Sequence, residues 1–580
     1  MSTFFSFLML LFLATGTGYI LLTKSMQSLH GAPFSLRIGA AYFTGLAFYI
    51  VLIRTFSSLL GHADWAVWCT IATACGLCLY FHRLLLILIT EFFSKKGALG
   101  VIFGLLIFSP IFLVYWMPGG QSVDNPFSFM GSLHSIRYAW IANFISACGV
   151  VPVIGQNTGQ SMLTYMAGSL SGSKPYVFLY FWLCSSLMFL SVFLYGFISL
   201  YESRWRLALC ATVMVMFGNS ALSLTHVLTI DSGSPFAITG YTDTLFGIFS
   251  VVMLLLLHTE SRFRNGKLLS LLPLAILICC ANFFTAPQNM LYLLALLPLL
   301  LLFSLKIRPL LKNCVFWSAC LIVAALVAVP QGGMLTPKSM QTLGDVPGLM
   351  STSNSGETKL PGIHLVPGVP FHFGWGGDWK SGQNGYLKEA KIYLEHPKLN
   401  LMPLLWIIEQ LFFTSLRILF FPIAGLIAIF LIWRKAGIPS NTQHYPITPS
   451  HATLSIFGIY TFLIGFLIDF TLLVNGYKWE LTRFMIPGIL IGMLGFSLYA
   501  IGFVDRNLKK GRYFLAATVF IMICGPIVNL FATTAKNITD TPGSPSMAER
   551  IKYFNGAGPT IEQNYCRIRL PVHDAPLTAR

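Results

Sequence analysis

Charged residues are scarce in this chain: they make up 10% of its 580 residues, while 55% of the residues are hydrophobic. A soluble domain carries about 25% charged residues because its surface must face water. Most of the surface of this chain must therefore face something other than water, which excludes a large soluble globular domain.

Several motifs that mark familiar chemistry are also missing. The chain has no Walker A loop, no GxSxG turn, no HExxH helix and no GxGxxG after a strand. Nucleotide use therefore has no support in the sequence.

Twelve cysteines are present without a CxxC…CxxC zinc pattern, and most lie inside apolar runs, where thiols behave as small hydrophobes. No disulfide set is implied.

Long apolar runs are what the chain has instead, and they are long enough to cross about 30 Å of hydrocarbon. They are apolar on every side, unlike the alternating strands of an outer-membrane barrel, and backbone groups in lipid must bond within their own segment. The first run has no basic residues ahead of it and no small-residue cleavage site, so we expect a retained helix and not a signal peptide. We predict an all-α polytopic integral membrane protein with about 12–14 transmembrane helices. The predicted spans are 4–23, 37–59, 65–82, 98–117, 176–199, 206–228, 243–258, 268–285, 288–304, 313–331, 411–433, 453–474, 482–504 and 513–533, with 84–94 as a shorter segment at the interface.

The basic residues predict which loops face the cytoplasm. The formal charge is +17, with 37 Lys and Arg against 20 Asp and Glu. In a soluble protein this excess would indicate nucleic acid. Here the basic residues cluster in every second short loop, which the positive-inside rule places in the cytoplasm, so we expect no nucleic-acid partner. The predicted organisation is 1–117 N-terminal transmembrane helices, 118–175 first large extracytoplasmic loop, 176–331 central transmembrane helices, 332–400 large extracytoplasmic loop, 401–533 C-terminal transmembrane helices and 534–580 extracytoplasmic tail.

The densest polar constellation lies in the 118–175 loop. Asp124 precedes a segment, 131–148, in which His134, Arg137 and Tyr138 would share one face of a helix at i, i+3 and i+4. A carboxylate, an imidazole and a guanidinium at a membrane surface could supply a general base, a polar contact and a phosphate clamp. The structural alternative is a helix cap with satisfied interfacial polar groups.

A second polar loop contains Asp231 and Asp243 and lies on the same predicted side as Asp124. Their carboxylates could bind a divalent cation, for which oxygen ligands are suited. The alternative, which we favour here, is an Asx turn at Asp231 and a helix cap at Asp243.

The large loop at 332–400 contains His372, Trp375 and Asp378 within a Gly- and aromatic-rich run. Such a surface could stack on the apolar faces of sugars and hydrogen-bond their hydroxyls. An aromatic belt that anchors the loop at the membrane surface is an equal alternative.

A fourth group, Lys478 and Arg483, precedes a span that begins near Pro487. Both cations are predicted outside, against the general charge bias, where they could hold a lipid phosphate at headgroup depth. Snorkelling anchors are an equal alternative.

Charges inside the predicted spans are the last feature. Glu409, Arg417 and Asp469 are the ones that the sequence singles out, and burial of such groups costs roughly 2.5–3.5 kcal/mol on insertion scales. A transporter shows ionisable or broken-helix features at the midplane of several spans. In this chain the polar residues concentrate at one membrane surface, which favours chemistry on a lipid-linked or extracellular substrate.

Three of these pieces together resemble the GT-C superfamily of polytopic glycosyltransferases, which use polyprenyl-phosphate-linked sugars. The resemblance covers about 118–300 and 400–510. It rests on Asp124 with His134, Arg137 and the Val151-Pro152 bend, on the Asp231–Asp243 loop, and on Arg483-Phe484 and Pro487, which resemble the Arg-Phe…Pro entry to a late helix in bacterial members.

The resemblance implies transfer of a sugar from a polyprenyl-phosphate donor to a glycan, lipid or protein acceptor at the outer face of a bacterial inner (plasma) membrane. Asp124 would match the general base, Arg137 and Arg483 would match phosphate-binding positions, and His134 would orient acceptor or donor. Family members place the carboxylate after the first span, whereas Asp124 follows about four spans. The chain also has no Asp-Asp or Glu-Asp pair at the expected place, which leaves the cofactor open, with Mg²⁺ or Mn²⁺ as the candidate.

Three other functions remain open on the sequence. An O-antigen polymerase or ligase would depend on His372 more than on Asp124. A transporter or flippase for lipid-linked glycans would depend on Glu409, Arg417 and Asp469. A membrane scaffold would depend on no single polar side chain.

Overall fold

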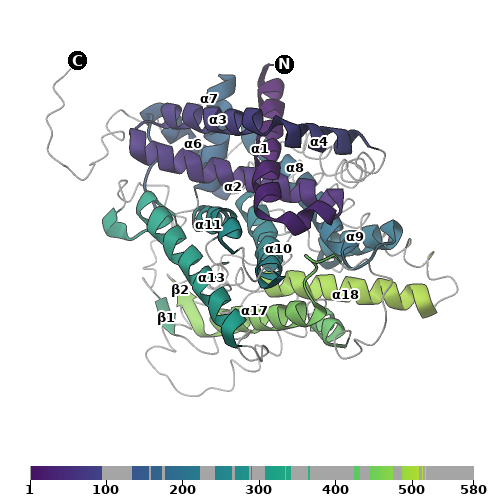
Figure 1. The fold of residues 1–580 in the computed structure, drawn as a ribbon. Helices are drawn as coiled ribbons and strands as arrows, with labels where there is room; N and C mark the ends of the chain where they lie inside the picture. Colours follow the sequence, from purple (N-terminus) through teal and green to yellow (C-terminus); the bar gives the residue numbers. More distant parts are fainter. Residues whose placement is uncertain are drawn as a thin grey trace, which may run out of the picture.

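The computed structural model is helical throughout most of the chain that it describes (Figure 1). Among the described residues, five helices are long and apolar enough to cross a membrane, namely α1, α2, α3, α11 and α13 with the short η3 that continues it. This confirms the helical fold class and indicates a membrane protein; the further predicted spans and the sides of the loops stay predictions. The structure describes residues 2–94, 133–155, 158–172, 177–221, 242–263, 268–286, 289, 307–333, 335–340, 363–365, 423–431, 445–474, 486–507, 513 and 516.

The helices begin and end close to the residues predicted from the apolar runs. The short segment predicted at 84–94 is a helix, and two further helices lie within 118–175. Apart from isolated positions, the predicted spans 98–117, 288–304 and 513–533 lie outside the described residues. The elements are α1 Ser2–Ser25, η1 Gln27–Gly31, α2 Phe34–Leu60, α3 Ala63–Tyr80, α4 His82–Phe93, α6 Leu133–Cys148, α7 Gly159–Ser171, α8 Val177–Ser199, α9 Trp205–Ala221, α10 Thr242–Phe263, α11 Leu268–Thr285, α13 Ile307–Ala328, η3 Val329–Gln331, η4 Lys338–Met340, β1 Ile363–Leu365, α17 His451–Thr471, β2 Leu472–Val474 and α18 Ile486–Asn507.

One short sheet departs from the all-α prediction. β1 and β2 pair antiparallel, with Ile363 opposite Val474 and Leu365 opposite Leu472. The predicted span 453–474 therefore ends as a helix at Thr471, and its last three residues form β2. β1 lies in the 332–400 loop, predicted outside, and β2 lies at the outer end of the span predicted at 453–474.

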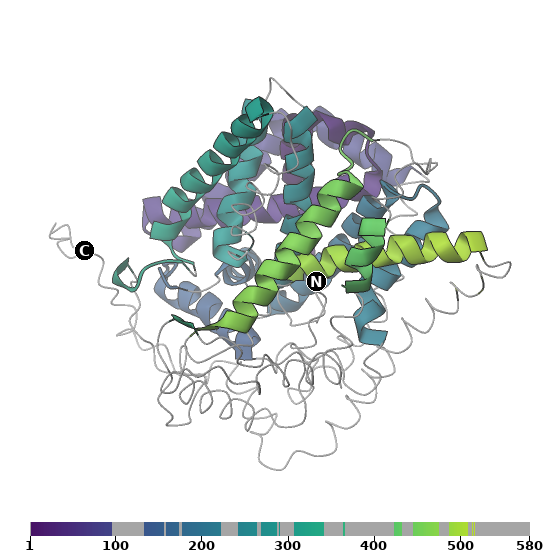
Figure 2. The same cartoon turned by 90° about the horizontal axis from the view of Figure 1, so that it is seen from below.

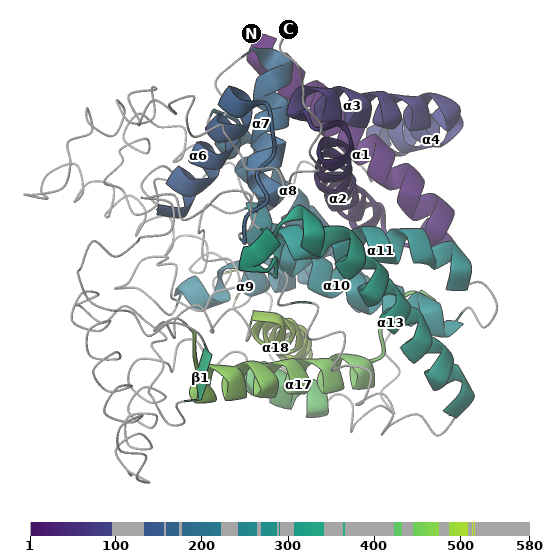
Figure 3. The same ribbon diagram turned by 90° about the vertical axis from the view of Figure 1, so that its left-hand side faces the viewer.

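The layout follows the sequence from one end of the molecule to the other. α1–α4 lie with α6–α8 at one end, and α17 and α18 lie at the opposite end, with α10 and α11 between them (Figures 1 and 3). Seen from below, the green and yellow α17 and α18 lie in front of the rest (Figure 2). α18 packs against α9 and α10, which joins the two ends.

Small residues allow α1 and α2 to cross closely. A Cβ at Gly18 would lie 1.8 Å from the Ala41 carbonyl oxygen, and one at Gly45 would lie 1.9 Å from the Ala14 carbonyl oxygen. Close backbone approach through small residues is the usual way helices associate in membranes, where burial of apolar surface gives no net drive. The crossing therefore requires glycine at both positions.

α2 is the central helix, with 18 of its 27 residues buried. Its Tyr42 stacks on Phe189 of α8, with ring centroids 4.2 Å apart, and the Tyr42 hydroxyl lies 2.8 Å and 2.9 Å from the hydroxyls of Ser185 and Ser186. The polar end of this aromatic side chain is thus satisfied inside an apolar bundle, as buried tyrosines require.

α13 exposes an apolar stripe on one face. Leu311, Val315, Ile322 and Leu326 are each at least 60% exposed, and their spacing places them along one side of the helix. A stripe of this kind is unfavourable in water and is expected where lipid covers a helix. This is the feature of the structure that most directly indicates a membrane.

The ends of the helices form two groups. Within the described part of the chain, the hydrogen bonds and ion pairs between connecting segments join segments predicted on the same side of the membrane. In the first group, contacts join 60–64, 149–155, Thr158, 283–286, 332–333 and 335–336. In the second, Ser28 contacts Glu260, Arg37 contacts Glu91, and Tyr201 contacts Pro449.

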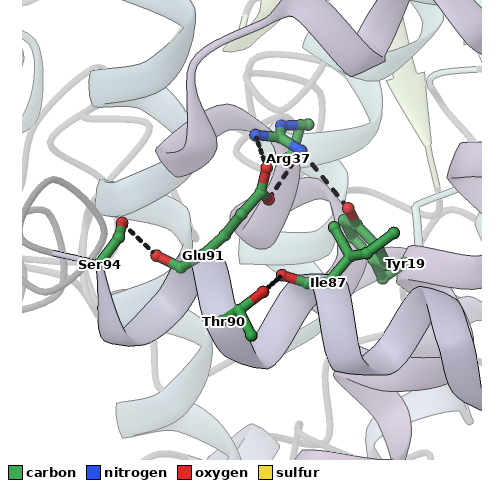
Figure 4. Close-up of polar contacts among 6 residues, drawn as sticks. All are labelled: Tyr19, Arg37, Ile87, Thr90, Glu91 and Ser94. Atoms are coloured by element: carbon green, nitrogen blue, oxygen red, sulfur yellow. Dashed lines mark hydrogen bonds and ion pairs between the residues drawn. The ribbon is translucent and has the colours of Figure 1, made fainter.

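The second group, predicted cytoplasmic, contains a partly exposed ion pair that joins α4 to α2. Arg37 donates from Nη2 to one Glu91 oxygen at 3.1 Å and lies 2.9 Å from the other through Nη1, which also donates to Tyr19 (Figure 4). Two-point contact of a guanidinium with a carboxylate is the strongest form of such a pair. α4 is thereby held across the ends of α1 and α2.

Candidate functional site

Four segments meet on the predicted outer side, and we call them the outer junction: 54–64, 148–155, 158–172 and 329–336. The Ala63 amide donates to the Gly149 carbonyl at 2.6 Å, and the Gly333 amide donates to the Ile154 carbonyl at 2.9 Å. Backbone pairing of this kind fixes non-helical segments that would otherwise leave buried polar groups unpaired. The 118–175 region is thus built into the helical core through α7 and the segment before it.

The centre of the outer junction is the guanidinium of Arg54. Arg54 is 1% exposed, and its Nη2 donates to the Pro152 carbonyl at 2.8 Å. Its Nε and Nη1 are buried and have no hydrogen-bond partner among the residues that the structure describes. Pro152 belongs to the Val151-Pro152 bend of the predicted motif, so the one described non-helical piece of that motif contacts a buried cation.

Two adjacent glycines allow close packing, Gly332 against Arg54 and Gly333 against Phe283. Gly332 has φ +116°, which an L side chain rarely adopts, and a Cβ there would lie 2.2 Å from Nη2 of Arg54. Gly333 has φ +113°, and a Cβ there would lie 2.6 Å from the Phe283 carbonyl oxygen. The Gly332-Gly333 pair is therefore a requirement of this packing.

A carboxylate lies at the edge of the outer junction, at the start of α3. The Tyr165 hydroxyl donates to Asp64 at 2.5 Å and the Ser169 hydroxyl donates to it at 3.1 Å, while the Asp64 amide donates to the His62 ring. Burial and the neighbouring Asp64 carboxylate raise the pKa of Tyr165, so this hydroxyl stays protonated as a donor. Asp64 is thereby fixed toward α7.

We predict that Tyr165→Phe lowers the free energy of unfolding by about 1 kcal/mol, because the half-exposed Asp64 can recover part of the lost hydrogen bond from water. Thermal unfolding of the purified protein in detergent measures the change. Tyr80→Phe, in which a 78% exposed tyrosine loses its hydroxyl, is the matched control and should show no change. Equal midpoints for the two variants would contradict the prediction.

Cys148, the last residue of α6, is disulfide-bonded. The side chain of its partner cysteine is not described. The sequence did not imply this bond, because the other cysteines mostly lie in apolar runs. Disulfides persist in oxidising compartments, which agrees with the predicted outer position of this region.

A buried amide network joins α10 to the end of α11. The Asn289 side-chain amide donates to Ser250 at 2.7 Å and to Asn282 at 3.0 Å, and the Ser250 hydroxyl donates to Asn282 at 2.9 Å. All three residues are at most 4% exposed. The network satisfies polar groups inside the bundle, as buried amides require.

The structure brings some predicted site residues into defined elements and leaves others outside its range. His134 and Arg137 lie on α6, which confirms the predicted helix, and Asp243 lies in the first turn of α10; the side chains of these three are outside the description. The remaining predicted residues lie outside the described residues: Asp124, Asp231, His372, Trp375, Asp378, Lys478 and Arg483.

The prediction of intramembrane charges was wrong in one respect, because it was incomplete. It named Glu409, Arg417 and Asp469, but Arg54 lies within the predicted span 37–59 and is fully buried. A single arginine in an apolar run is the sequence signal that would have found it. Asp64 lies between the predicted spans 37–59 and 65–82, where a single carboxylate carries no such signal.

No metal centre is formed by the part of the chain that the structure describes: no three His, Cys, Asp or Glu side chains gather there in a way that could hold an ion. Asp231 and the side chain of Asp243 are not described, so the structure tests neither the possible Mg²⁺ or Mn²⁺ site there nor the favoured alternative, an Asx turn and a helix cap.

Comparison of the chain with protein-family models, curated proteins and solved structures found no match.

Proposed function

We propose that this chain is a membrane glycosyltransferase. It transfers a sugar from a polyprenyl-phosphate-linked donor to a glycan, lipid or protein acceptor outside the cytoplasm, as a step in building a bacterial cell-envelope polysaccharide. Its partners are then the lipid-linked donor, the acceptor and the surrounding membrane lipids.

The observation that carries this proposal is the outer junction. Polar and charged groups gather there, with Arg54 buried against Pro152 and Asp64 held by α7. An enzyme that acts on a phosphate-linked lipid needs positive charge near headgroup depth and a carboxylate base near the acceptor. The α6 helix that carries His134 and Arg137 packs against α7, which is part of the same junction.

The residues take the following roles in this proposal. Asp124 removes the proton from the acceptor hydroxyl as it attacks the anomeric carbon, and the bond from that carbon to the phosphate oxygen breaks. Arg137 and Arg483 hold the phosphate of the lipid carrier, which leaves with the electron pair of the broken bond. His134 orients the acceptor or the donor, and Lys478 contacts the donor phosphate. Asp231 and Asp243 would hold a divalent cation if the transfer uses one. A sugar stacks on Trp375 beside His372 and Asp378.

The test is a transfer assay with the full-length protein in liposomes. A panel of polyprenyl-phosphate sugars with radiolabelled sugar is supplied together with candidate glycan acceptors. The proposal predicts release of polyprenyl phosphate in proportion to labelled product. Movement of intact donor across the bilayer without cleavage would contradict it.

We predict that Arg483→Ala weakens donor binding more than it slows the chemical step, because Arg483 contacts the phosphate in both the bound donor and the product. The KM for the donor should rise about tenfold, with kcat reduced less. Steady-state kinetics in nanodiscs measures both constants. An unchanged donor KM would remove Arg483 from the donor site.

A transporter or flippase for lipid-linked glycans is the second candidate. The observation in its favour is that the charged residue Arg54 is buried inside a predicted span. Ionisable residues inside spans mark substrate pathways in transporters. Arg54 lies only six residues from the end of α2, however, and not at the midplane. The liposome assay separates the two functions, because a transporter moves donor and leaves its sugar–phosphate bond intact.

A further inference from the structure

Arg54 is a buried cation with unused donors. A guanidinium stays protonated in proteins and presents five N–H groups. One donor on Nη2 is taken by the Pro152 carbonyl, while Nε and Nη1 are sealed from solvent without acceptors. No carboxylate pairs with it in the described part of the chain, whose ion pairs involve other residues.

Such an arrangement is unfavourable unless an anion joins it. An unsatisfied buried donor costs about 1–3 kcal/mol, and more when the group is charged. A carbonyl oxygen supplies one acceptor and only a partial negative charge. An oxyanion supplies several acceptors and a full charge, and arginine is the residue that matches phosphate and carboxylate geometry best.

The position of Arg54 fits an anion at a membrane surface. It lies six residues before Leu60, the last residue of α2, which is about 9 Å along the helix axis. Its guanidinium contacts Pro152 and lies beside Gly332, and both residues belong to short non-helical segments. Displacement of such a segment disturbs fewer hydrogen bonds than displacement of a helix, so we expect an anion to reach the guanidinium from this side.

We infer that Arg54 binds the phosphoryl group of an anionic ligand at the outer junction. If the proposed function holds, on which this identification rests, the ligand is the polyprenyl-phosphate carrier. Arg54 is then a phosphate-binding residue in addition to Arg137 and Arg483. The same chemistry would accept a free phosphate, and the experiment separates the two sources.

The experiment measures binding by the full-length protein in nanodiscs. The probes are farnesyl phosphate, farnesol and inorganic phosphate, each followed by microscale thermophoresis. Arg54→Met keeps the length of the side chain and removes its charge, and Arg54→Lys keeps the charge and removes the planar fork. Arg206→Met is the matched control, since Arg206 is exposed at the start of α9 and lies on the predicted opposite side.

We expect farnesyl phosphate to bind wild type and the Arg206 variant equally, and farnesol to bind neither. The Kd of Arg54→Met should rise about tenfold or more, with a smaller rise for Arg54→Lys. If inorganic phosphate binds as tightly as farnesyl phosphate, the site binds a free anion and the lipid carrier is not its ligand. Unchanged farnesyl phosphate affinity in a folded Arg54 variant would overturn the inference.

If neither Arg54 variant folds, a cryo-EM structure of the wild-type protein with farnesyl phosphate decides the question. Phosphate beyond hydrogen-bond reach of Arg54 overturns the inference. If the protein binds farnesyl phosphate through Arg54 but transfers no sugar, the inference about Arg54 is supported and the proposed function is contradicted. If Arg54→Met transfers sugar at the wild-type rate, the proposed function is supported and the inference about Arg54 is contradicted.

Discussion

Asp124→Asn is expected to abolish sugar transfer while the protein stays folded and inserted. The change removes the carboxylate that accepts the proton of the acceptor hydroxyl and keeps the size of the side chain. General-base catalysis contributes about 10²–10⁴-fold to rate. The transfer assay described above, run at saturating donor, measures the loss as a fall in kcat of that order.

The control for Asp124→Asn is Asp505→Asn. Asp505 lies near the end of α18, on the predicted cytoplasmic side, and undergoes the same chemical change. Its variant should transfer sugar at the wild-type rate. Size-exclusion profiles of both variants establish that they are folded. Normal turnover by the Asp124 variant would remove Asp124 as the base.

Gly45→Ala is expected to destabilise the protein by about 2–3 kcal/mol. The added methyl group would lie 1.9 Å from the Ala14 carbonyl oxygen and 2.5 Å from the Ala14 carbonyl carbon. These are backbone atoms, so α1 and α2 must move apart, and overpacking without a flexible neighbour is costly. A titration of the purified protein with SDS, followed by tryptophan fluorescence, measures the change in unfolding midpoint.

Gly76→Ala is the matched control for this change. Gly76 lies within α3, and a Cβ there would meet nothing within 4 Å. Alanine is favoured over glycine inside a helix by roughly 0.5–1 kcal/mol, so this variant should be as stable as wild type or more so. If Gly45→Ala matches Gly76→Ala, α1 and α2 do not cross where the structure has them.

Much of the helical architecture follows from the sequence because lipid leaves the backbone so few alternatives. The apolar run predicted at 268–285 is α11, with the same bounds. The run predicted at 37–59 is α2, which extends a little further at both ends. Boundaries were accurate where a turn signal is present, as at Gly61, whose φ of +68° ends α2.

The parts that sequence did not supply depend on contacts between distant residues. α7 consists largely of small and polar residues, so its pattern is typical of a loop, yet most of it is buried between other helices. β1 and β2 pair across more than a hundred residues, and no local pattern of three residues predicts that. Arg54 lies in an apolar run that predicts a helix, but the run does not predict that Arg54 contacts the Pro152 carbonyl.

The candidate site could be predicted only in outline. The sequence indicated that 118–175 belongs on the outer side with functional residues, and α6 has the helical form that the spacing of His134 and Arg137 required. It did not indicate that Arg54 and Asp64 contact this region. Those contacts arise from tertiary packing of α2, α3 and α7, which spacing along the chain does not contain.

The burial of α2 has a consequence for how the protein is made. α8, one of its main contacts, begins at Val177, more than a hundred residues after Leu60, which corresponds to on the order of ten seconds of synthesis. During that interval the face of α2 that later meets α8 has only lipid or the insertion machinery beside it. The apolar sequence of α2 is therefore required by its passage through the bilayer before assembly as much as by its final place among other helices.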